Sequence, residues 1–225
     1  MKHTAKQMSE SVWLGMVLAL SGGFMDAYSY LCRDEVFANA QTGNILLFGV
    51  NVVHRNFYTA FHYLCPVVAF TLGIILSDVV RHQINQKNSL HWRQIAVLGE
   101  AIILLIVSLI PAGFSLVANS LTSLACGIQV ESFRTIHGNG VATTMCIGNL
   151  RSGTQNLCEF FATREKRYLW KSGLFYGIIL FFVLGAIMGS LMIQIFGERA
   201  IMICSALLLV AFLMMFTEFE RKKNE

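Results

Sequence analysis

Charged residues are scarce in this sequence. Asp, Glu, Lys and Arg make up 13% of the 225 residues, whereas hydrophobic residues make up 55%. Soluble domains are about a quarter charged, so the composition predicts a polytopic membrane protein instead. The 17 basic residues outnumber the 13 acidic ones, but they lie beside apolar segments and not along one face. We therefore expect no nucleic-acid partner and interpret the basic residues as topology signals.

The motifs of common enzyme and metal-site classes are also missing. The six cysteines form no CxxC pair, and the six histidines form no HExxH pattern. The sequence has no GxSxG, no P-loop, no dinucleotide fingerprint and no paired aspartate motif of an intramembrane protease. We expect no enzymatic activity, no metal and no cofactor, and we interpret the cysteines as reduced packing residues.

The sequence instead contains several long apolar windows. A helix needs about 20 residues to cross the hydrocarbon core, and six windows reach or approach that length. They are Val12–Cys32, Phe57–Val80, Trp92–Ile110, the more polar Phe114–Phe133, Trp170–Phe196 and Ala200–Phe216. The first window has no small-residue cleavage site and more windows follow it, so it is predicted to be a retained helix. The chain is thus predicted to be one all-α membrane domain over residues 1–225.

One further segment, Val36–Val53, is apolar but interrupted by polar side chains and by glycine. A displacement of 105 positions superposes it on a second copy, with matches that fall on residues of unusual backbone or charge. The matched pairs are Gly43-Asn44 with Gly148-Asn149, Gly22 with Gly127, Val36 with Val141, Asn51 with Asn156, Asp26 with Glu131, and Tyr28 with Phe133. This pattern predicts two repeats, at about 12–110 and 114–217.

The basic residues decide whether these two segments cross the membrane. If they re-enter, the chain has six crossings and cytoplasmic termini, and all lysines and arginines except Arg33, Arg55 and Arg199 lie inside. The inside set is Lys2, Lys6, Arg81, Lys87, Arg93, Arg134, Arg151, Arg164, Lys166, Arg167, Lys171, Arg221, Lys222 and Lys223. Eight crossings would move Arg81, Lys87, Arg93 and Arg134 out and Arg55 in. The arrangement with six crossings places more lysines and arginines on the cytoplasmic side, and this excess favours it.

A repeat unit with an odd number of crossings must insert its second copy upside down. The prediction is therefore a 3+3 inverted repeat with two broken or re-entrant segments that enter from opposite faces and meet near the midplane. The alternative is that both segments are amphipathic helices at the membrane interface, capped by asparagine for ordinary reasons.

The two Gly-Asn segments are the first candidate site. Thr42 ends an entry loop, Gly43 permits a tight turn, and Asn44 is predicted to cap a half-helix whose exposed amides carry about half a positive charge. Gly148 and Asn149 repeat the arrangement. Such an end attracts an anion or a carbonyl dipole. Arg151, just beyond, is predicted to neutralise an acid or to contact an anionic substrate.

Two intramembrane acids are the second candidate site. Asp26 lies one turn after Gly22-Gly23, and Glu131 lies with Gln129 in the most polar window. An acid inside the bilayer costs about 3 kcal/mol and normally faces a cavity or a partner. Proton or cation coupling is the functional hypothesis for this pair, and hydrogen bonding between helices is the structural alternative.

At these residues the sequence resembles the YoaK-type family of bacterial inner-membrane proteins, a domain of unknown function. The motifs GGFMDAYSYL, FANAQTGNILLFG and TTMCIGNLRSG carry the resemblance, which covers nearly the whole chain. Ile147 stands where the family pattern has threonine, so a hydroxyl role at that position is in doubt. The resemblance implies a multi-pass protein of the bacterial plasma membrane and implies no substrate.

Three functions stay open. The first is a transporter of a small solute or ion, proton- or cation-coupled, with an uncoupled channel as its close variant. The second is a membrane scaffold or assembly protein that uses small residues such as Gly73 and Gly185 for helix association, with a homo-oligomer as one outcome. The third is an intramembrane enzyme that acts on a lipid. Besides the bilayer, the expected partner of the first is an unidentified solute or ion.

Overall fold

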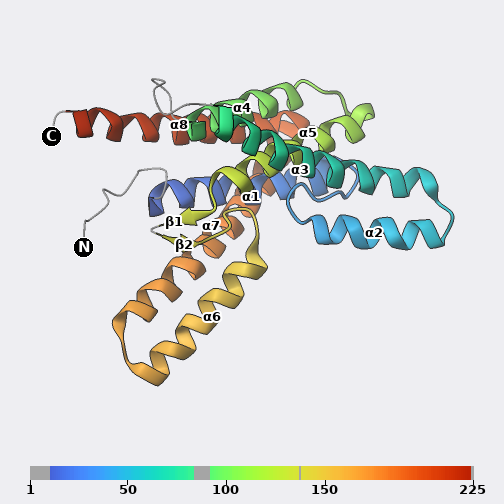
Figure 1. Ribbon diagram of the computed structural model, residues 1–225. Helices are drawn as coiled ribbons and strands as arrows, with labels where there is room; N and C mark the ends of the chain where they lie inside the picture. The colour runs from blue at the N-terminus through green and yellow to red at the C-terminus, as the bar shows by residue number, and fades with distance from the viewer. Residues whose placement is uncertain (1–10, 84–91, 137, 224–225) are drawn as a thin grey trace.

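The fold is all-helical apart from one short strand pair. The structure, a computed structural model, describes residues 11–83, 92–136 and 138–223, with the backbone alone for 216–223. Within these ranges, eight α-helices follow one another through short turns (Figure 1). Both chain ends lie outside the described residues, as do Lys2, Lys6, Lys87 and His137.

The observed helices agree closely with the apolar windows of the sequence. They are α1 (Val12–Cys32), α2 (Gln41–Val53), α3 (Phe57–Gln83), α4 (Trp92–Val107), α5 (Ser115–Ser132), α6 (Cys146–Thr163), α7 (Lys166–Phe196) and α8 (Met202–Lys223). Two 3₁₀ turns, η2 (Ala112–Phe114) and η3 (Gly197–Ile201), precede α5 and α8. Strands β1 (Thr135–Ile136) and β2 (Asn139–Gly140) form an antiparallel hairpin after α5. The prediction of an all-α protein is confirmed.

Three stretches of the described chain are long and apolar enough to cross a membrane. They are Phe57–Gln83, Ala112–Ser132 and Lys166–Met215, by length and composition. The last stretch runs through α7, η3 and α8, and Gly197 interrupts it with a φ of 55°. A membrane protein is thus supported by the fold as well as by the composition.

The second four helices repeat the order and the packing of the first four. Helix α1 packs along α7 as α3 packs along α5, and α2 pairs with α3 as α6 pairs with α7. Two helix hairpins, α2–α3 and α6–α7, project from the bundle in different directions (Figure 1). Helices α4 and α8 pack on each other.

Glycines allow the two long helix pairs to come into backbone contact. A Cβ atom on Gly185 of α7 would collide with the backbone of Leu20 on α1, and one on Gly73 of α3 would collide with the backbone of Leu124 on α5. Gly189, one turn after Gly185, lies beside Phe24, one turn after Leu20. Helices α1 and α7 therefore run in the same direction, with small residues in the seam as the sequence predicted.

The main core lies where α1, α4, α5 and α8 meet. Phe24 and Met25 of α1, Leu104 of α4, Cys126 of α5 and Leu208 of α8 are all fully buried there. Because this core sits between the two halves, neither half buries its apolar face alone. The site described below lies beside this core.

Candidate functional site

The chain reverses direction after α1 and runs back along it. Asp34 and Glu35 adopt left-handed backbone conformations, with φ of 61° and 57°, and this reversal returns residues 36–40 to the helix they have just left. The Ala38 amide donates to Ser29 Oγ at 3.0 Å, and Asn39 Nδ2 donates to the Gly22 carbonyl at 3.0 Å. The returning segment, residues 36–40, thus reaches Gly22, the middle residue of α1, before α2 begins.

Asp26 holds this returning segment in place. Its Oδ1 accepts a hydrogen bond from the Asn39 amide at 2.7 Å, and the amides of Ala38 and Ala40 also interact with the carboxylate. Amide N–H groups around a carboxylate stabilise its charged form. The carboxylate therefore binds the segment that leads into α2, and it lies one turn after Gly22 on the same helix.

Asn44 and Asn149 make the same contacts in the two repeats. Asn44 Oδ1 accepts from the Phe37 amide at 3.1 Å, and its Nδ2 donates to the Phe37 carbonyl at 2.7 Å. Asn149 does the same with Ala142, at 3.2 and 2.6 Å. Phe37 and Ala142 are themselves 105 positions apart, so the repeat found in the sequence is also a repeat of geometry.

The predicted helix start at Asn44 is wrong by one turn. Helix α2 begins at Gln41 after Ala40, and α6 begins at Cys146 after Met145, and neither of these preceding residues makes a side-chain cap bond. Asn44 and Asn149 instead sit within the first turn and bind the loop that enters it. The asparagine side chain can bind both the amide and the carbonyl of a loop residue because it has one acceptor oxygen and an amide group with two donors.

The second segment reaches the same part of α1 from the other repeat. Gln129 Nε2 donates to Thr143 Oγ1 at 3.1 Å and to the Leu18 carbonyl at 3.0 Å. A Cβ atom on Gly22 would lie 3.2 Å from Thr144 Cγ2, so Thr144 packs directly on Gly22. We name Gly22, Asp26, Asn39, Gln129, Thr143 and Thr144 the central site.

The other predicted site residues lie around the central site or away from it. Thr42, Gly148 and Arg151 are exposed, and Gly43 packs against the ring of Phe37. Glu131 is buried and forms an ion pair with Arg134 at 2.7 Å, so its partner is not Arg151. Asp26 and Glu131 match in sequence but differ in partners, because Asp26 binds backbone amides and Glu131 binds a guanidinium.

Sequence reasoning gave no role to Asn39, Thr143 and Thr144. All three are buried, and they lie inside the motifs that carry the family resemblance. Their polarity within apolar segments could have marked them as site residues. Their partners could not be predicted, because these lie on other helices. Among the described residues, no group of three or more His, Cys, Asp or Glu side chains is placed to hold a metal ion.

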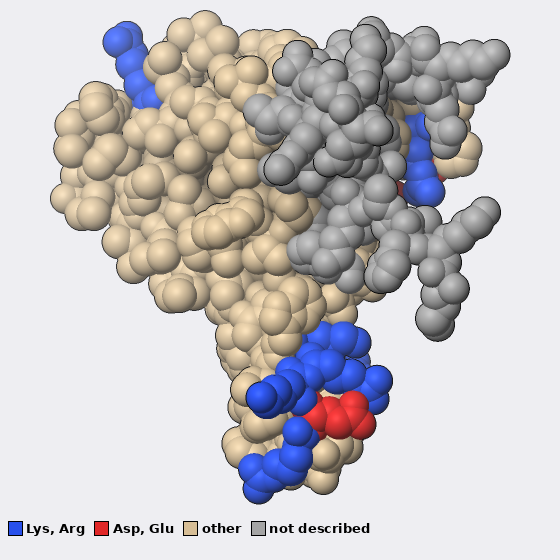
Figure 2. Space-filling view, turned by 90° about the vertical axis from the view of Figure 1, so that its left-hand side faces the viewer, with Lys and Arg blue, Asp and Glu red and all other residues tan. Residues whose placement is uncertain are grey.

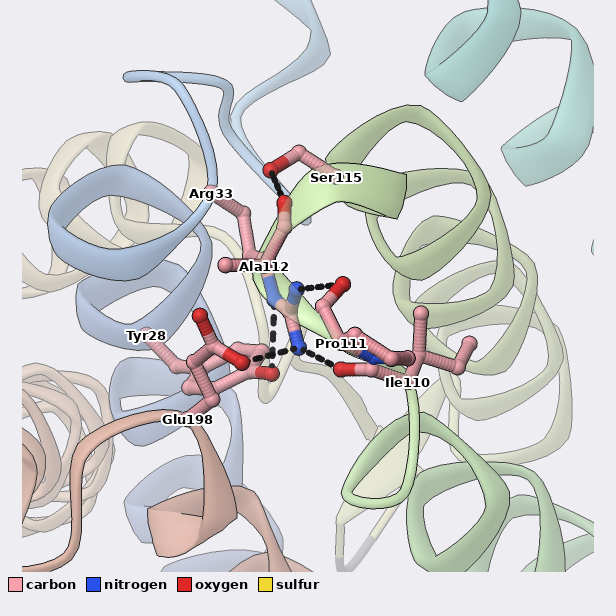
Figure 3. Close-up of polar contacts among 7 residues, drawn as sticks. All are labelled: Tyr28, Arg33, Ile110, Pro111, Ala112, Ser115 and Glu198. Atoms are coloured by element: carbon pink, nitrogen blue, oxygen red, sulfur yellow. Dashed lines mark hydrogen bonds and ion pairs between the residues drawn. The ribbon is translucent and has the colours of Figure 1, made fainter.

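Arg33 is a second polar centre that the sequence did not reveal. Its guanidinium is fully buried and donates to Tyr28 Oη at 2.9 Å, to the Pro111 carbonyl at 3.0 Å and to the Ile110 carbonyl at 2.7 Å (Figure 3). Asn119 Nδ2 donates to the Arg33 carbonyl at 2.6 Å. The end of α1 is thereby fixed to the connection between the two repeats.

Comparison with known proteins agrees with the resemblance seen in the sequence. The family model described as "Protein of unknown function (DUF1275)" matches residues 14–214. The "UPF0700 transmembrane protein YoaK" of Bacillus subtilis (strain 168) is 25% identical over 187 residues, which cover 78% of this chain and 80% of that protein. No solved structure matches.

Proposed function

We propose that this protein, which belongs to the DUF1275 family of unknown function, transports a small solute across the bacterial inner membrane through the central site. One observation carries the proposal. Both broken segments reach the middle of α1 at Gly22, one turn before Asp26, and the Asp26 carboxylate binds the segment before α2. Broken helices that end at a shared interior site are the usual construction of a transporter binding site.

The proposed topology has six crossings, by α1, α3, α4, α5, α7 and α8, in a 3+3 inverted repeat. The position of Arg33 supports this topology, because it brings the end of α1 to Ile110 and Pro111, after α4 and before α5. Helix α5 therefore starts at the face where α1 ends. Helices α2 and α6 then re-enter and leave without crossing.

The basic residues support a cytoplasmic location for the face opposite to the one where α1 ends and α5 starts. Figure 2 shows lysines and arginines gathered at the end of a projecting part of the molecule, which is the turn between α6 and α7. Arg164 and Glu165 lie in the turn, and Lys166, Arg167 and Lys171 lie at the start of α7. Such clusters stay on the cytoplasmic side of the membrane.

The solute proposed for the site has an acceptor group such as a carboxylate or a carbonyl. The first amides of a helix have no partners within the helix and carry a partial positive charge. In α2 the Gln41 and Gly43 amides already donate to the Asn39 and Ala40 carbonyls, so the start of α6, which follows Thr143 and Thr144 of the central site, is the helix end proposed to bind the solute. Asp26 would supply the coupling proton or cation, and the exposed Arg151 would attract an anionic solute at the entrance.

The experiment uses purified protein in liposomes that contain a pH-sensitive dye. Small carboxylates and small amides are the test solutes, and uptake is compared with and without an imposed pH gradient. We expect Asp26→Asn to remove the proton movement that accompanies uptake. Asp78→Asn is the control, because Asp78 is half exposed and pairs with Arg81 on the same helix. Coupled uptake that survives Asp26→Asn would contradict the coupling role.

An uncoupled channel is the second candidate, favoured by the polar, buried face of α5, which contains Asn119, Thr122, Ser123 and Gln129. For a channel, solute flux in the same liposomes should depend on the solute gradient and should not change with the pH gradient. A scaffold or assembly protein would give no flux with any solute, and its function would depend on the Gly73 and Gly185 seams and not on Asp26.

A further inference from the structure

Helix α6 and the first half of α7 form an arm that stands out from the bundle. Helix α6 packs on α7, and no other helix contacts it extensively within the described residues. Figure 2 shows the arm as a projecting part of the molecule, with basic side chains at its far end. We name that end, residues 159–171, the arm tip. Because the arm leaves the bundle, the neighbours of the arm tip in a bilayer are lipids.

The length of α6 brings the arm tip to the level of the lipid headgroups. Helix α6 begins at Cys146, two residues after Thr144, which packs on Gly22 in the middle of α1. Its 18 residues span about 27 Å at 1.5 Å per residue, whereas half of the hydrocarbon core measures about 15 Å. In the proposed topology, even a strongly tilted α6 therefore reaches the membrane surface at its far end.

Three cations of the arm tip have no acidic partner. The arm tip contains four basic residues and two acids. Glu165 pairs with Arg167, whereas Arg164, Lys166 and Lys171 make no ion pair with any described residue. Arg164 and Lys166 are exposed, and Lys171 is partly exposed. The arm tip therefore presents uncompensated positive charge, which attracts anions.

Exposed aromatic side chains lie beside these charges. Phe161 is 60% exposed and Trp170 is 52% exposed, and the Arg164 guanidinium lies 6.0 Å from the centre of the Phe161 ring. Tryptophan is enriched at the headgroup level of membranes, because its ring is largely apolar and carries one polar group. A free anion in water would leave these rings without an apolar partner. A phospholipid offers a phosphate and acyl chains together.

The corresponding arm of the first repeat shows that the fold does not require the charge. Helices α2 and α3 form that arm, and Arg55 is the one Lys or Arg between Gln41 and Val80. Both arms nevertheless start with the same asparagine contacts, those of Asn44 and Asn149. The charge bias of membrane topology accounts for which arm is basic, but not for the exposed rings beside the charges.

We propose that the arm tip binds the headgroup of an anionic phospholipid such as phosphatidylglycerol. Arg164, Lys166 and Lys171 hold the phosphate through charge-assisted hydrogen bonds, and Phe161 and Trp170 pack on the acyl chains. Binding fixes the arm and, with it, the start of α6 beside the central site. That the lipid thereby alters solute uptake rests on the proposed transporter function, whereas the binding itself does not.

Native mass spectrometry of the full chain tests the binding without any solute. Protein in detergent with equal amounts of phosphatidylglycerol and phosphatidylcholine should retain phosphatidylglycerol preferentially. We expect the triple variant Arg164→Gln, Lys166→Gln and Lys171→Gln to lower this preference at least about tenfold, because each basic group near a membrane surface adds to the attraction. An unmodified protein that retains both lipids equally would overturn the proposal.

A second triple variant controls for net charge. Arg55→Gln, Arg81→Gln and Arg199→Gln remove the same charge from exposed positions away from the arm. This variant should keep the preference of the unmodified protein. A loss of preference as large as that of the arm variant would mean that overall charge and not the arm tip selects the lipid, and the proposal would be wrong.

Competition in the unmodified protein separates a lipid from a soluble anion. Inorganic phosphate and glycerol phosphate should leave the retained phosphatidylglycerol unchanged, because neither has an acyl chain for the aromatic rings. Displacement by glycerol phosphate as strong as that by added lipid would overturn the assignment to a lipid. These measurements involve no transported solute, so a failure of the transport proposal would appear only in the liposome experiment and would leave them unchanged.

Discussion

Arg33 Nη2 lies 3.7 Å from Glu198 Oε2 and so joins the end of α1 to the turn before α8. The same guanidinium donates to two carbonyls at the connection between the repeats. One buried side chain therefore contacts both halves of the fold at one end of the bundle. Its contribution is expected to be structural, because each of its three nitrogens donates to a protein acceptor.

Arg33→Met should destabilise the protein by about 3 kcal/mol, because it leaves buried carbonyls and Tyr28 Oη without a donor. Glu198→Gln is the matched change on the other side of the ion pair. Glu198 is 32% exposed, so its loss should cost less than about 1 kcal/mol. Thermal unfolding in detergent measures both, and equal losses would contradict the assignment.

Asn44→Ala and Asn149→Ala should each cost about 1–2 kcal/mol, because each leaves a partly buried backbone amide and carbonyl unpaired. The repeat predicts losses of similar size in the two variants. Asn51→Ala is the control, since Asn51 Nδ2 bonds to Leu47 in its own helix. Thermal unfolding is again the measurement. An Asn51→Ala loss as large as that of Asn44→Ala would count against the special role of the loop contact.

Gly185→Ala should destabilise by about 1–3 kcal/mol, because its Cβ would collide with the Leu20 backbone and force α1 away from α7. Gly177→Ala in the same helix meets nothing within 4 Å. That control should be neutral or slightly stabilising, since alanine favours helix over glycine by about 1 kcal/mol. The yield of folded protein and its unfolding temperature compare the two, and identical behaviour would refute the close seam.

Cysteine labelling in intact cells tests the six crossings. In a Cys158→Ser background, His54→Cys in the α2–α3 turn should react with a membrane-impermeant maleimide from outside. Glu165→Cys in the α6–α7 turn should react only after the cells are opened. Both native positions are exposed, so accessibility to the reagent is governed by the membrane. Protection of residue 54 in intact cells would instead favour eight crossings.

The sequence predicted the elements well because long apolar windows and the repeat are local patterns. The first predicted window, Val12–Cys32, is the observed α1, and the displacement of 105 positions matches Asn44 to Asn149, which make equivalent contacts in the structure. The start of the half-helices was misplaced, because asparagine is also favoured where it binds a preceding loop. That choice depends on backbone torsions that the sequence does not display.

What the sequence alone determined is a membrane protein of two related halves, since low charge, apolar runs and a repeated Gly-Asn motif are properties of residue order. The tertiary structure decided which polar groups meet. Arg33, Asn39 and Glu100 owe their surroundings to residues on other helices, and Asp26 and Glu131 acquired different partners despite matching positions. Partners in a bundle are set by which helix faces pack together, and that information is distributed over the whole chain.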